Sequence, residues 1–300
     1  MTKFKAWISA ARLRTLPLSI AGIITASAAA LQAGYFSSTI FSLALLTTLG
    51  FQILSNFAND YGDGVKGTDN HERVGPARAM QSGLLSATEL KSGIVITAII
   101  SLILACSLIY VAFGSENIIY TLLFFLLGIT AIVAAITYTV GKGAYGYKAL
   151  GDVFVFLFFG LLGVLGCYFL YTKNLNQLII LPAIVIGLLS TAVLNLNNMR
   201  DRQADANVQK NTLAVLLGGS KAKGYHFFLV VSAFVIALFY FMLKGENSLK
   251  YIPLLAFVPL LIHLKRVYEN SEPKLLDPEL KKVALSTFLF SLLFFVSSCI

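Results

Sequence analysis

Amide and carboxylate side chains occur at helical spacing in a short segment about one fifth of the way along the chain. Asn56, Asp60 and Asp63 are spaced i, i+4, i+7, and Asn59 lies four residues before Asp63. If a helix continues through this segment, these side chains share one stripe, with neighbouring Cβ atoms about 5–6 Å apart. Carboxylates this close at the end of an apolar helix repel one another and lose solvation. A divalent cation would relieve both penalties.

A second segment repeats the arrangement, because Asn197, Asn198, Asp201 and Asp205 again share one stripe. Four predicted helices separate the stripes, which is the spacing expected of an internal duplication. Mg²⁺ prefers oxygen ligands and commonly links one or two carboxylates to a phosphate. Two facing stripes could therefore hold a diphosphate. The alternative, acids at helix ends that only face water, explains a single Asp pair better than two matched stripes.

Basic residues accompany both segments. They are Lys66, Arg73, Arg78, Arg200, Arg202 and Lys210. Arg can bind phosphate bidentately, whereas Lys binds it as a point charge. Some of these cations must serve only to orient the protein in a membrane. Phosphate contact is therefore an expectation, mainly for Arg73, Arg78 and Lys210. Of the three histidines, only His71, between the two segments, is worth testing.

The composition of the 300 residues indicates an integral membrane protein. Hydrophobic residues make up 57% and charged residues only 12%, about half the charged share of soluble domains. Mean hydropathy is +0.80. We expect residues 1–300 to form one membrane domain. The net charge of +9 does not indicate nucleic acid binding, because basic residues in a membrane protein first report topology.

Nine stretches are long enough, or nearly so, to cross a hydrocarbon core that needs about 20 apolar residues. They are residues 17–34, 39–57, 93–113, 117–140, 151–171, 177–197, 225–243, 251–268 and 283–299. The predicted fold class is therefore an all-α bundle of nine transmembrane helices, with two pseudo-repeated four-helix halves and one further helix.

The distribution of charge tests this count. Of the 23 Lys and Arg residues, only Lys173, Lys244 and Lys250 fall on one side of the predicted bundle. By the positive-inside rule the other side, with the N-terminus, is cytoplasmic. Among the acids only Glu116 and Glu246 lie on the far side. Both acidic segments thus fall in predicted cytoplasmic loops, 58–92 and 198–224.

At these residues the chain resembles the UbiA family of intramembrane prenyltransferases. The stretches that carry the resemblance are Asn59-Asp60-Tyr61-Gly62-Asp63 with Asp69, Glu72 to Pro76, Met80 to Gly83, Ile136 to Gly141, Gly151-Asp152, Asp201-xxx-Asp205, and Lys210-x-Thr212-Leu213 continuing to Gly218. They cover nearly the whole chain. Within the family, the similarity is greatest to members that prenylate 1,4-dihydroxy-2-naphthoate in menaquinone biosynthesis.

The resemblance implies a Mg²⁺-dependent transfer of an all-trans polyprenyl group from its diphosphate to 1,4-dihydroxy-2-naphthoate, with loss of carbon dioxide. The implied metal ligands are Asp60, Asp63, Asp69, Asp201 and Asp205. The implied substrate-binding residues are Asn56, Asn59, Lys66, Arg73, Arg78, Asn197, Asn198 and Lys210. The apolar helices would supply a dry channel for the prenyl tail.

Two further residues have open roles. Asp152 is either a base or an orienting group for the acceptor, or simply an acid favoured at a helix N-terminus. Tyr138 either faces the allylic cation or is an aromatic residue at the membrane interface.

Competing functions remain at this stage. A prenyltransferase with another acceptor (4-hydroxybenzoate, homogentisate or haem) would share the same metal site. A cation-coupled transporter fits less well, since transporter sites lie near the midplane. The expected surroundings are the lipid bilayer of the cytoplasmic membrane, with no nucleic acid and no obligate protein partner.

Overall fold

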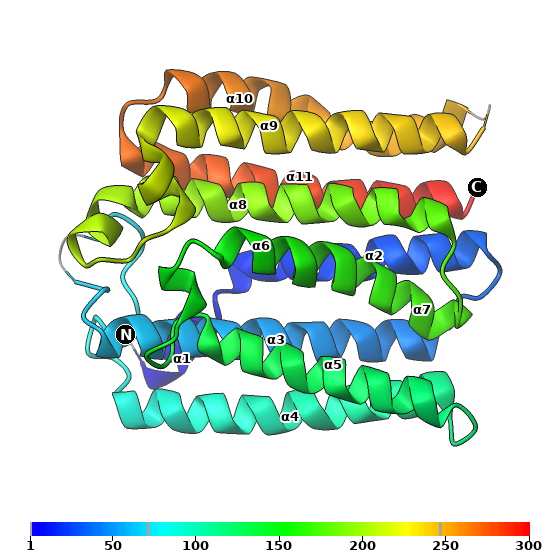
Figure 1. Ribbon diagram of the computed structural model, residues 1–300, viewed down its shortest axis with the longest axis horizontal. Coiled ribbons are helices and arrows are strands. Elements are labelled where there is room, and N and C mark those ends of the chain that lie inside the picture. The colour runs from blue at the N-terminus through cyan, green and yellow to red at the C-terminus, as the bar shows by residue number, and fades with distance from the viewer. Residues whose placement is uncertain (1, 71–72, 246–247) are drawn as a thin grey trace.

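The computed structural model describes residues 2–70, 73–245 and 248–300. His71, Glu72 and Glu246 lie outside the described residues. The described parts of the chain are helical apart from their connections, and their one β-type pairing is an isolated bridge between Lys148 and Asn211. The helices lie side by side as a bundle (Figure 1). The predicted all-α architecture is therefore confirmed.

Nine helical segments in the described ranges are long and apolar enough to span a membrane, as the sequence predicts. Their main helices are α1 (Lys3–Ala11) with α2 (Leu16–Gln32), α3 (Ser38–Val65), α4 (Ala87–Phe113), α5 (Ile118–Thr137), α6 (Gly151–Val155) with α7 (Cys167–Thr172), α8 (Ile180–Asn207), α9 (Leu213–Leu243), α10 (Val258–Glu269) and α11 (Leu276–Ser298). A π-helical stretch, Phe156–Gly166, joins α6 to α7 in the fifth span. Shorter 3₁₀ turns are Leu13–Thr15, Tyr145–Tyr147, Gln177–Ile179, Ser248–Phe257 and Pro273–Leu275.

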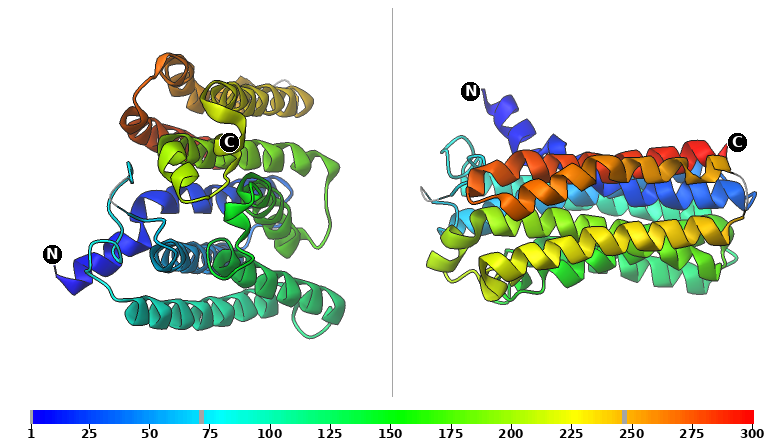
Figure 2. Two further views of the ribbon diagram at one scale, coloured as in Figure 1. Left: turned by 60° about the vertical axis from the view of Figure 1, so that its left-hand side comes forward. Right: turned by 90° about the horizontal axis from the view of Figure 1, so that it is seen from above.

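Polar residues mark where the helices begin. Ser86 accepts a hydrogen bond from the backbone of Glu89, and the Glu89 side chain accepts one from the backbone of Ser86, a capping box that starts α4. Ser37 and Thr212 cap α3 and α9 in the same way. Arg12 adopts φ 50° and ends α1. As a result α1 leaves the bundle at an angle (Figure 2).

The predicted loop boundaries are wrong at both acidic segments. Residues 58–65 belong to α3, and α8 continues to Asn207. Residues 87–92 belong to α4 and residues 213–224 to α9. The helices run past the apolar stretches because their acidic stripes are buried and paired inside the protein instead of facing water. The connections that remain are residues 66–86 and 208–212.

The two acidic segments end on the same side of the bundle. In Figure 1 the α3–α4 and α8–α9 connections both lie at the left, and the C-terminus lies at the right. Helices α9 and α10 form one edge of the bundle and α4 the other, in Figures 1 and 2 alike. The orientation of this bundle relative to the cytoplasm stays a prediction.

Candidate active site

The end of α3 is held by amide hydrogen bonds to neighbouring elements. Asn56 is buried and donates from Nδ2 to the carbonyl oxygen of Ala11 at 2.8 Å. Asn59 accepts a hydrogen bond from Thr139 Oγ1 at 3.2 Å. Gly62 allows this approach, because a Cβ there would lie 2.5 Å from the same Thr139 Oγ1. These contacts fix how the acidic stripe of α3 faces the interior.

Asp60 is buried and only partly satisfied. Its Oδ2 accepts a hydrogen bond from the backbone N–H of Ala79 at 3.1 Å. Its Oδ1 has no hydrogen-bond partner among the described residues. A buried ionised carboxylate with a free oxygen is costly, so this oxygen is a natural ligand position for a cation.

Lys210 joins the two acidic segments. Its Nζ lies 3.4 Å from Asp63 Oδ2 and 3.7 Å from Asp205 Oδ1. The hydroxyl of Tyr147 donates to Asp63 Oδ1 at 2.8 Å. Burial acts to lower the pKa of Lys210, but the charges of Asp63 and Asp205 outweigh it and raise the pKa above its usual value. Lys210 therefore stays charged between the two carboxylates.

Arg73 makes a second bridge between the segments. It pairs through Nη1 with Asp69 Oδ1, and its Nη2 lies 3.8 Å from Asp201 Oδ2. Arg78 Nε lies 3.8 Å from the other oxygen of Asp69. Burial raises the pKa of Asp69. Burial also lowers the pKa of Arg78 well below its usual value, and the positive charges of Arg12 and Arg73 lower it further. Arg73 and Arg78 therefore both lie against the carboxylate of Asp69, and Arg73 connects it to Asp201.

Arg200, which the sequence does not single out from its basic neighbours, is fully buried and holds Asp201 in place. Its Nε and Nη2 donate to the two oxygens of Asp201 at 3.1 and 2.7 Å. Nη2 also donates to Asn197 Oδ1 at 2.8 Å, and Nη1 pairs with Asp277 of α11. The backbone N–H of Gly75 donates to Asp201 Oδ1 at 3.2 Å. Asp201 is thus the most constrained acid of the set.

A cavity of about 390 Å³ begins between these segments and continues into the bundle. Its polar end is lined by Arg12, Arg14, Thr15, Asn56, Asn59, Asp63, Arg73, Arg78, Tyr138, Asn197, Asn198, Asp201 and Lys210. Ala44, also on its wall, stands 19 residues before Asp63 on α3. At 1.5 Å per residue, the cavity therefore extends about 28 Å along that helix.

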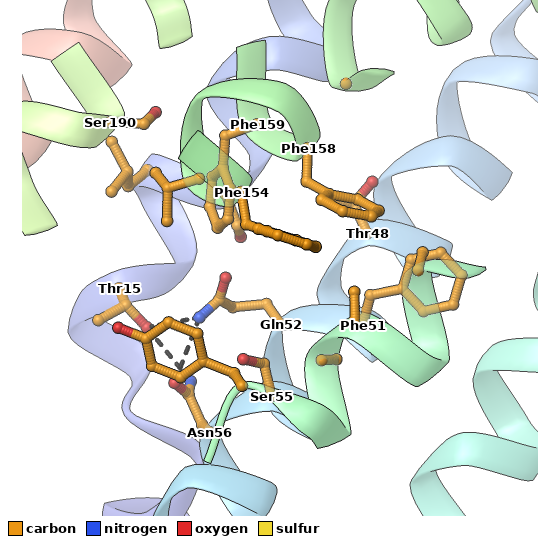
Figure 3. Close-up of a pocket in the computed structure, with 18 of the residues that line it drawn as sticks. Thr15, Thr48, Phe51, Gln52, Ser55, Asn56, Phe154, Phe158, Phe159 and Ser190 are labelled. Carbon is orange, nitrogen blue, oxygen red and sulfur yellow. Dashed lines mark hydrogen bonds between the residues drawn. The ribbon is translucent and has the colours of Figure 1, made fainter. Parts of the chain in front are cut away.

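The middle of the cavity is aromatic. Figure 3 shows Phe154, Phe158 and Phe159 close together above Gln52, and Phe51 of α3 lines the same cavity. The Phe154 ring stacks on Tyr145 at 4.0 Å, and Tyr145 contacts Tyr138 edge-on at 5.2 Å. Gln52 Nε2 donates to Asn56 Oδ1 at 3.2 Å. An apolar, π-rich wall therefore follows directly on the charged end.

The structure brings most predicted site residues together but not all of them to the cavity wall. Asp60, Asp69 and Asp205 lie beside the lining residues and are buried. Lys66 is exposed, with Nζ 4.1 Å from the centroid of the Tyr147 ring. Asp152 is buried and does not line the cavity, and the hydroxyl of Tyr225 on α9 is its side-chain hydrogen-bond partner.

Other lining residues have no predicted role in the site. Arg12 and Arg14, which lie outside both acidic segments, line the polar end. Nε and Nη2 of Arg12 are buried without hydrogen-bond partners in the described chain. Tyr145, which lines the cavity, and Tyr147, which bonds Asp63 from beside it, follow the Tyr138 motif closely and could have been included on that ground. Arg12 offers no such local signal.

The donor set fits a divalent cation that prefers oxygen. Asp60 and Asp63 on α3 and Asp205 on α8 offer carboxylates whose polar partners within the described parts of the chain are Ala79, Tyr147 and Lys210. Among the described residues, no three His, Cys, Asp or Glu side chains are preassembled as a metal cluster. Here Lys210 occupies the position between Asp63 and Asp205, where a divalent ion would neutralise both.

Comparison with known proteins agrees with this fold and site. The sequence profile of the UbiA prenyltransferase family matches residues 20–294. The chain is 46% identical over 294 residues to 1,4-dihydroxy-2-naphthoate octaprenyltransferase of Haemophilus influenzae, covering 97% of this chain and 95% of that protein. It is 41% identical to the protein of the same name from Escherichia coli K12, with 98% and 95% covered.

Solved structures share the architecture. A UbiA homolog from Aeropyrum pernix K1 superposes with a TM-score of 0.68 at 13% identity, covering 93% of this chain and 96% of that one. A UbiA homolog from Archaeoglobus fulgidus bound to DMAPP and Mg²⁺ superposes at 0.61 with 18% identity, covering 96% and 99%. With its full-length match and this fold, the chain belongs to the UbiA prenyltransferase family and is a multi-pass membrane protein.

Proposed function

We propose that this protein transfers an all-trans polyprenyl group from its diphosphate to 1,4-dihydroxy-2-naphthoate, giving demethylmenaquinol, diphosphate and carbon dioxide. The observation that carries the proposal is the joining of two acidic helix ends, through Lys210 and Arg73, at the polar end of a long apolar cavity. The names of relatives that are more than 40% identical support the choice of donor and acceptor.

The polar end suits a diphosphate. Arg12, Arg73, Arg78 and Lys210 all line it, and guanidinium groups bind phosphate oxygens bidentately. The proposed metal ligands are Asp60, Asp63 and Asp205, with Asp69 and Asp201 completing the acidic set. Mg²⁺ bound there would neutralise the leaving diphosphate and so favour breaking of the bond to the allylic carbon. Asn56, Asn59, Asn197 and Asn198 would orient the head group.

The reaction balances without an added reactant. The C1–O bond of the allylic diphosphate breaks, and its electron pair leaves with the diphosphate. The electron-rich ring carbon that bears the carboxylate forms a C–C bond to C1. The carboxylate then leaves as carbon dioxide, and its electron pair restores the aromatic ring. The aromatic wall of Tyr138, Phe154 and Phe158 would stabilise the allylic cation, and the apolar cavity would exclude water.

Tyr138 and Asp152 take different proposed roles. Tyr138 lines the cavity and contacts the ring of Tyr145 edge-on, so we assign it to the aromatic wall and not to the role of a base. A Cβ on Gly151 would lie 3.2 Å from the Tyr138 hydroxyl oxygen, so Asp152 follows a residue that packs directly on this ring. We therefore assign Asp152 an orienting role behind the aromatic wall. Lys66 would contact the phosphates only from the entrance.

We infer that the site faces the cytoplasm from the cytoplasmic membrane. The support is the concentration of Lys and Arg on the side that carries both acidic segments. An external thiol reagent, applied to intact cells with single cysteines placed at Lys173 or Lys142, tests this orientation. Labelling at position 173 only is expected; labelling at position 142 only would reverse the topology.

An assay with purified membranes tests the activity. Dihydroxynaphthoate and a polyprenyl diphosphate should yield prenylated product with Mg²⁺ present and none with a chelator. Asp60→Asn should lower turnover by a factor of about 10²–10³ while the protein remains inserted and folded, and exposed Glu272→Gln serves as the control. Product from 4-hydroxybenzoate but not from dihydroxynaphthoate would overturn the acceptor assignment. Near-normal turnover by Asp60→Asn would overturn the metal assignment.

A further inference from the structure

The apolar end of the cavity has several small residues among the larger apolar ones that line it. Beyond the aromatic section shown in Figure 3, the wall includes Ala44, Ala105, Gly128 and Gly166. The depth of this part follows from α8. Gly160 packs against Gly187, which stands fourteen residues, or about 21 Å, before Asp201. Gly166 lies six residues further from the polar end.

Gly166 is not required by its backbone. Its φ of −61° and ψ of −47° are open to any residue, and glycine is unfavourable inside a helix. Nor is it required by helix packing. A Cβ at position 166 would first meet the flexible end of Leu162 at 3.2 Å and then Phe124 Cε1 at 3.8 Å, and both residues line the cavity.

Gly128 of α5 presents the same situation. A Cβ there would meet only Ala105 Cβ, at 3.9 Å. Gly160 shows the contrast, because its Cβ would lie 2.6 Å from the Gly187 Cα and could not be accommodated. Glycines in membrane helices commonly permit close helix contact. Gly160 fits that explanation, whereas Gly128 leaves room for a side chain, and a side chain at Gly166 would meet only other side chains that line the cavity.

Gly128 lies on α5, which has the smallest buried share of the nine membrane-length segments in the described residues. Of α5, only Ala134 is fully buried. On the opposite side runs the π-helical stretch Phe156–Gly166, an irregularity often found at functional sites. A substrate tail that follows the cavity away from the acidic segments would therefore pass between Gly128 and Gly166.

We propose that Gly128 and Gly166 are specificity-determining residues, which keep this passage wide enough for the distal isoprene units of a long prenyl donor. The proposal rests on the proposed prenyl transfer. A ten-carbon geranyl tail ends before the passage, whereas a forty-carbon octaprenyl tail must enter it. Side-chain volume at these two positions therefore limits the length of donor that the enzyme accepts.

A comparison of kcat/KM for a short and a long prenyl donor measures the effect of these two positions. Full-length Gly166→Leu and Gly128→Leu proteins in membranes are assayed for kcat/KM with geranyl and octaprenyl diphosphates, with dihydroxynaphthoate as acceptor. We expect geranyl transfer to stay close to wild type, and octaprenyl transfer to fall by about tenfold or more. Gly166→Ala should give a smaller loss in the same direction. Gly224→Leu, at an exposed helical glycine with open space around it, should change neither.

The outcomes separate the two proposals. Geranyl turnover itself reports that each variant is folded. If wild type transfers both donors and the Leu variants lose both equally or neither, the specificity assignment is wrong. If wild type transfers neither donor to any aromatic acceptor, the proposed function fails instead.

Discussion

The ammonium nitrogen of Lys210 lies 3.4 Å from a carboxylate oxygen of Asp63, although 147 residues separate them in the chain. The same nitrogen lies 3.7 Å from Asp205. This one cation neutralises acids from both halves of the protein, at the point where the proposed diphosphate and metal would meet.

Replacing Lys210 by Met should destabilise the protein most when no divalent ion is present. Removing one partner of a buried ion pair costs about 3–5 kcal/mol. Added Mg²⁺ should restore part of this loss, because it can neutralise Asp63 and Asp205 in place of the ammonium. Thermal unfolding in EDTA and in Mg²⁺ measures the difference. A loss that Mg²⁺ leaves unchanged would contradict a shared position for the two cations.

Asp63→Asn should remove turnover without unfolding the protein. The amide oxygen can still accept the hydrogen bond of the Tyr147 hydroxyl, but the negative charge beside Lys210 is lost. We expect a decrease of at least about 10² in kcat/KM. Tyr147→Phe removes the hydroxyl that bonds both Asp63 and Thr68 but keeps the charge of Asp63, so it should cost about 0.5–1.5 kcal/mol of stability per bond and leave turnover largely intact. The reverse order of effects would show that the hydrogen bond matters more than the charge.

Arg200→Lys should behave as a disruptive change. Arg200 uses its planar fork to hold both oxygens of Asp201 while it reaches Asn197 and Asp277, and an ammonium cannot reproduce this geometry. A stability loss of several kcal/mol is expected from the unpaired buried groups. Arg202 is half-buried and forms no ion pair among those found in the described residues, so Arg202→Lys should show little change. Equal melting temperatures for both variants would argue against a positioning role for Arg200.

Gly62→Ala and Gly64→Ala form a matched pair. At position 62 the new Cβ would lie 2.8 Å from the backbone carbon of Thr139, which cannot move aside. At position 64 it would meet the flexible side chain of Met80. We expect Gly62→Ala to cost about 1–3 kcal/mol and to lower turnover, since α3 carries the acidic stripe. Gly64→Ala should be tolerated. Denaturation in detergent and the prenyl transfer assay read out both effects.

Local sequence patterns were enough to predict the membrane spans and the residues that make up each acidic stripe. Nine apolar stretches needed no tertiary information, because hydrocarbon thickness sets helix length. The i, i+4, i+7 spacing of Asn56, Asp60 and Asp63 likewise predicts a shared face, since neighbours on a helix are determined by its pitch. The apolar stretches by themselves end before α3 and α8 do, because hydropathy does not register polar residues that are buried and paired inside the protein.

Only the tertiary structure decided how the stripes are used. Lys210 lies between Asp63 and Asp205, Arg200 holds Asp201 against Asp277, and Arg12 lines the cavity. Asp152, which shares a chemical type with the other acids, lies off the cavity wall. Such pairings join residues far apart in sequence, and their energies depend on distance and burial. Helix packing sets both quantities, and residue spacing along one helix carries no record of either.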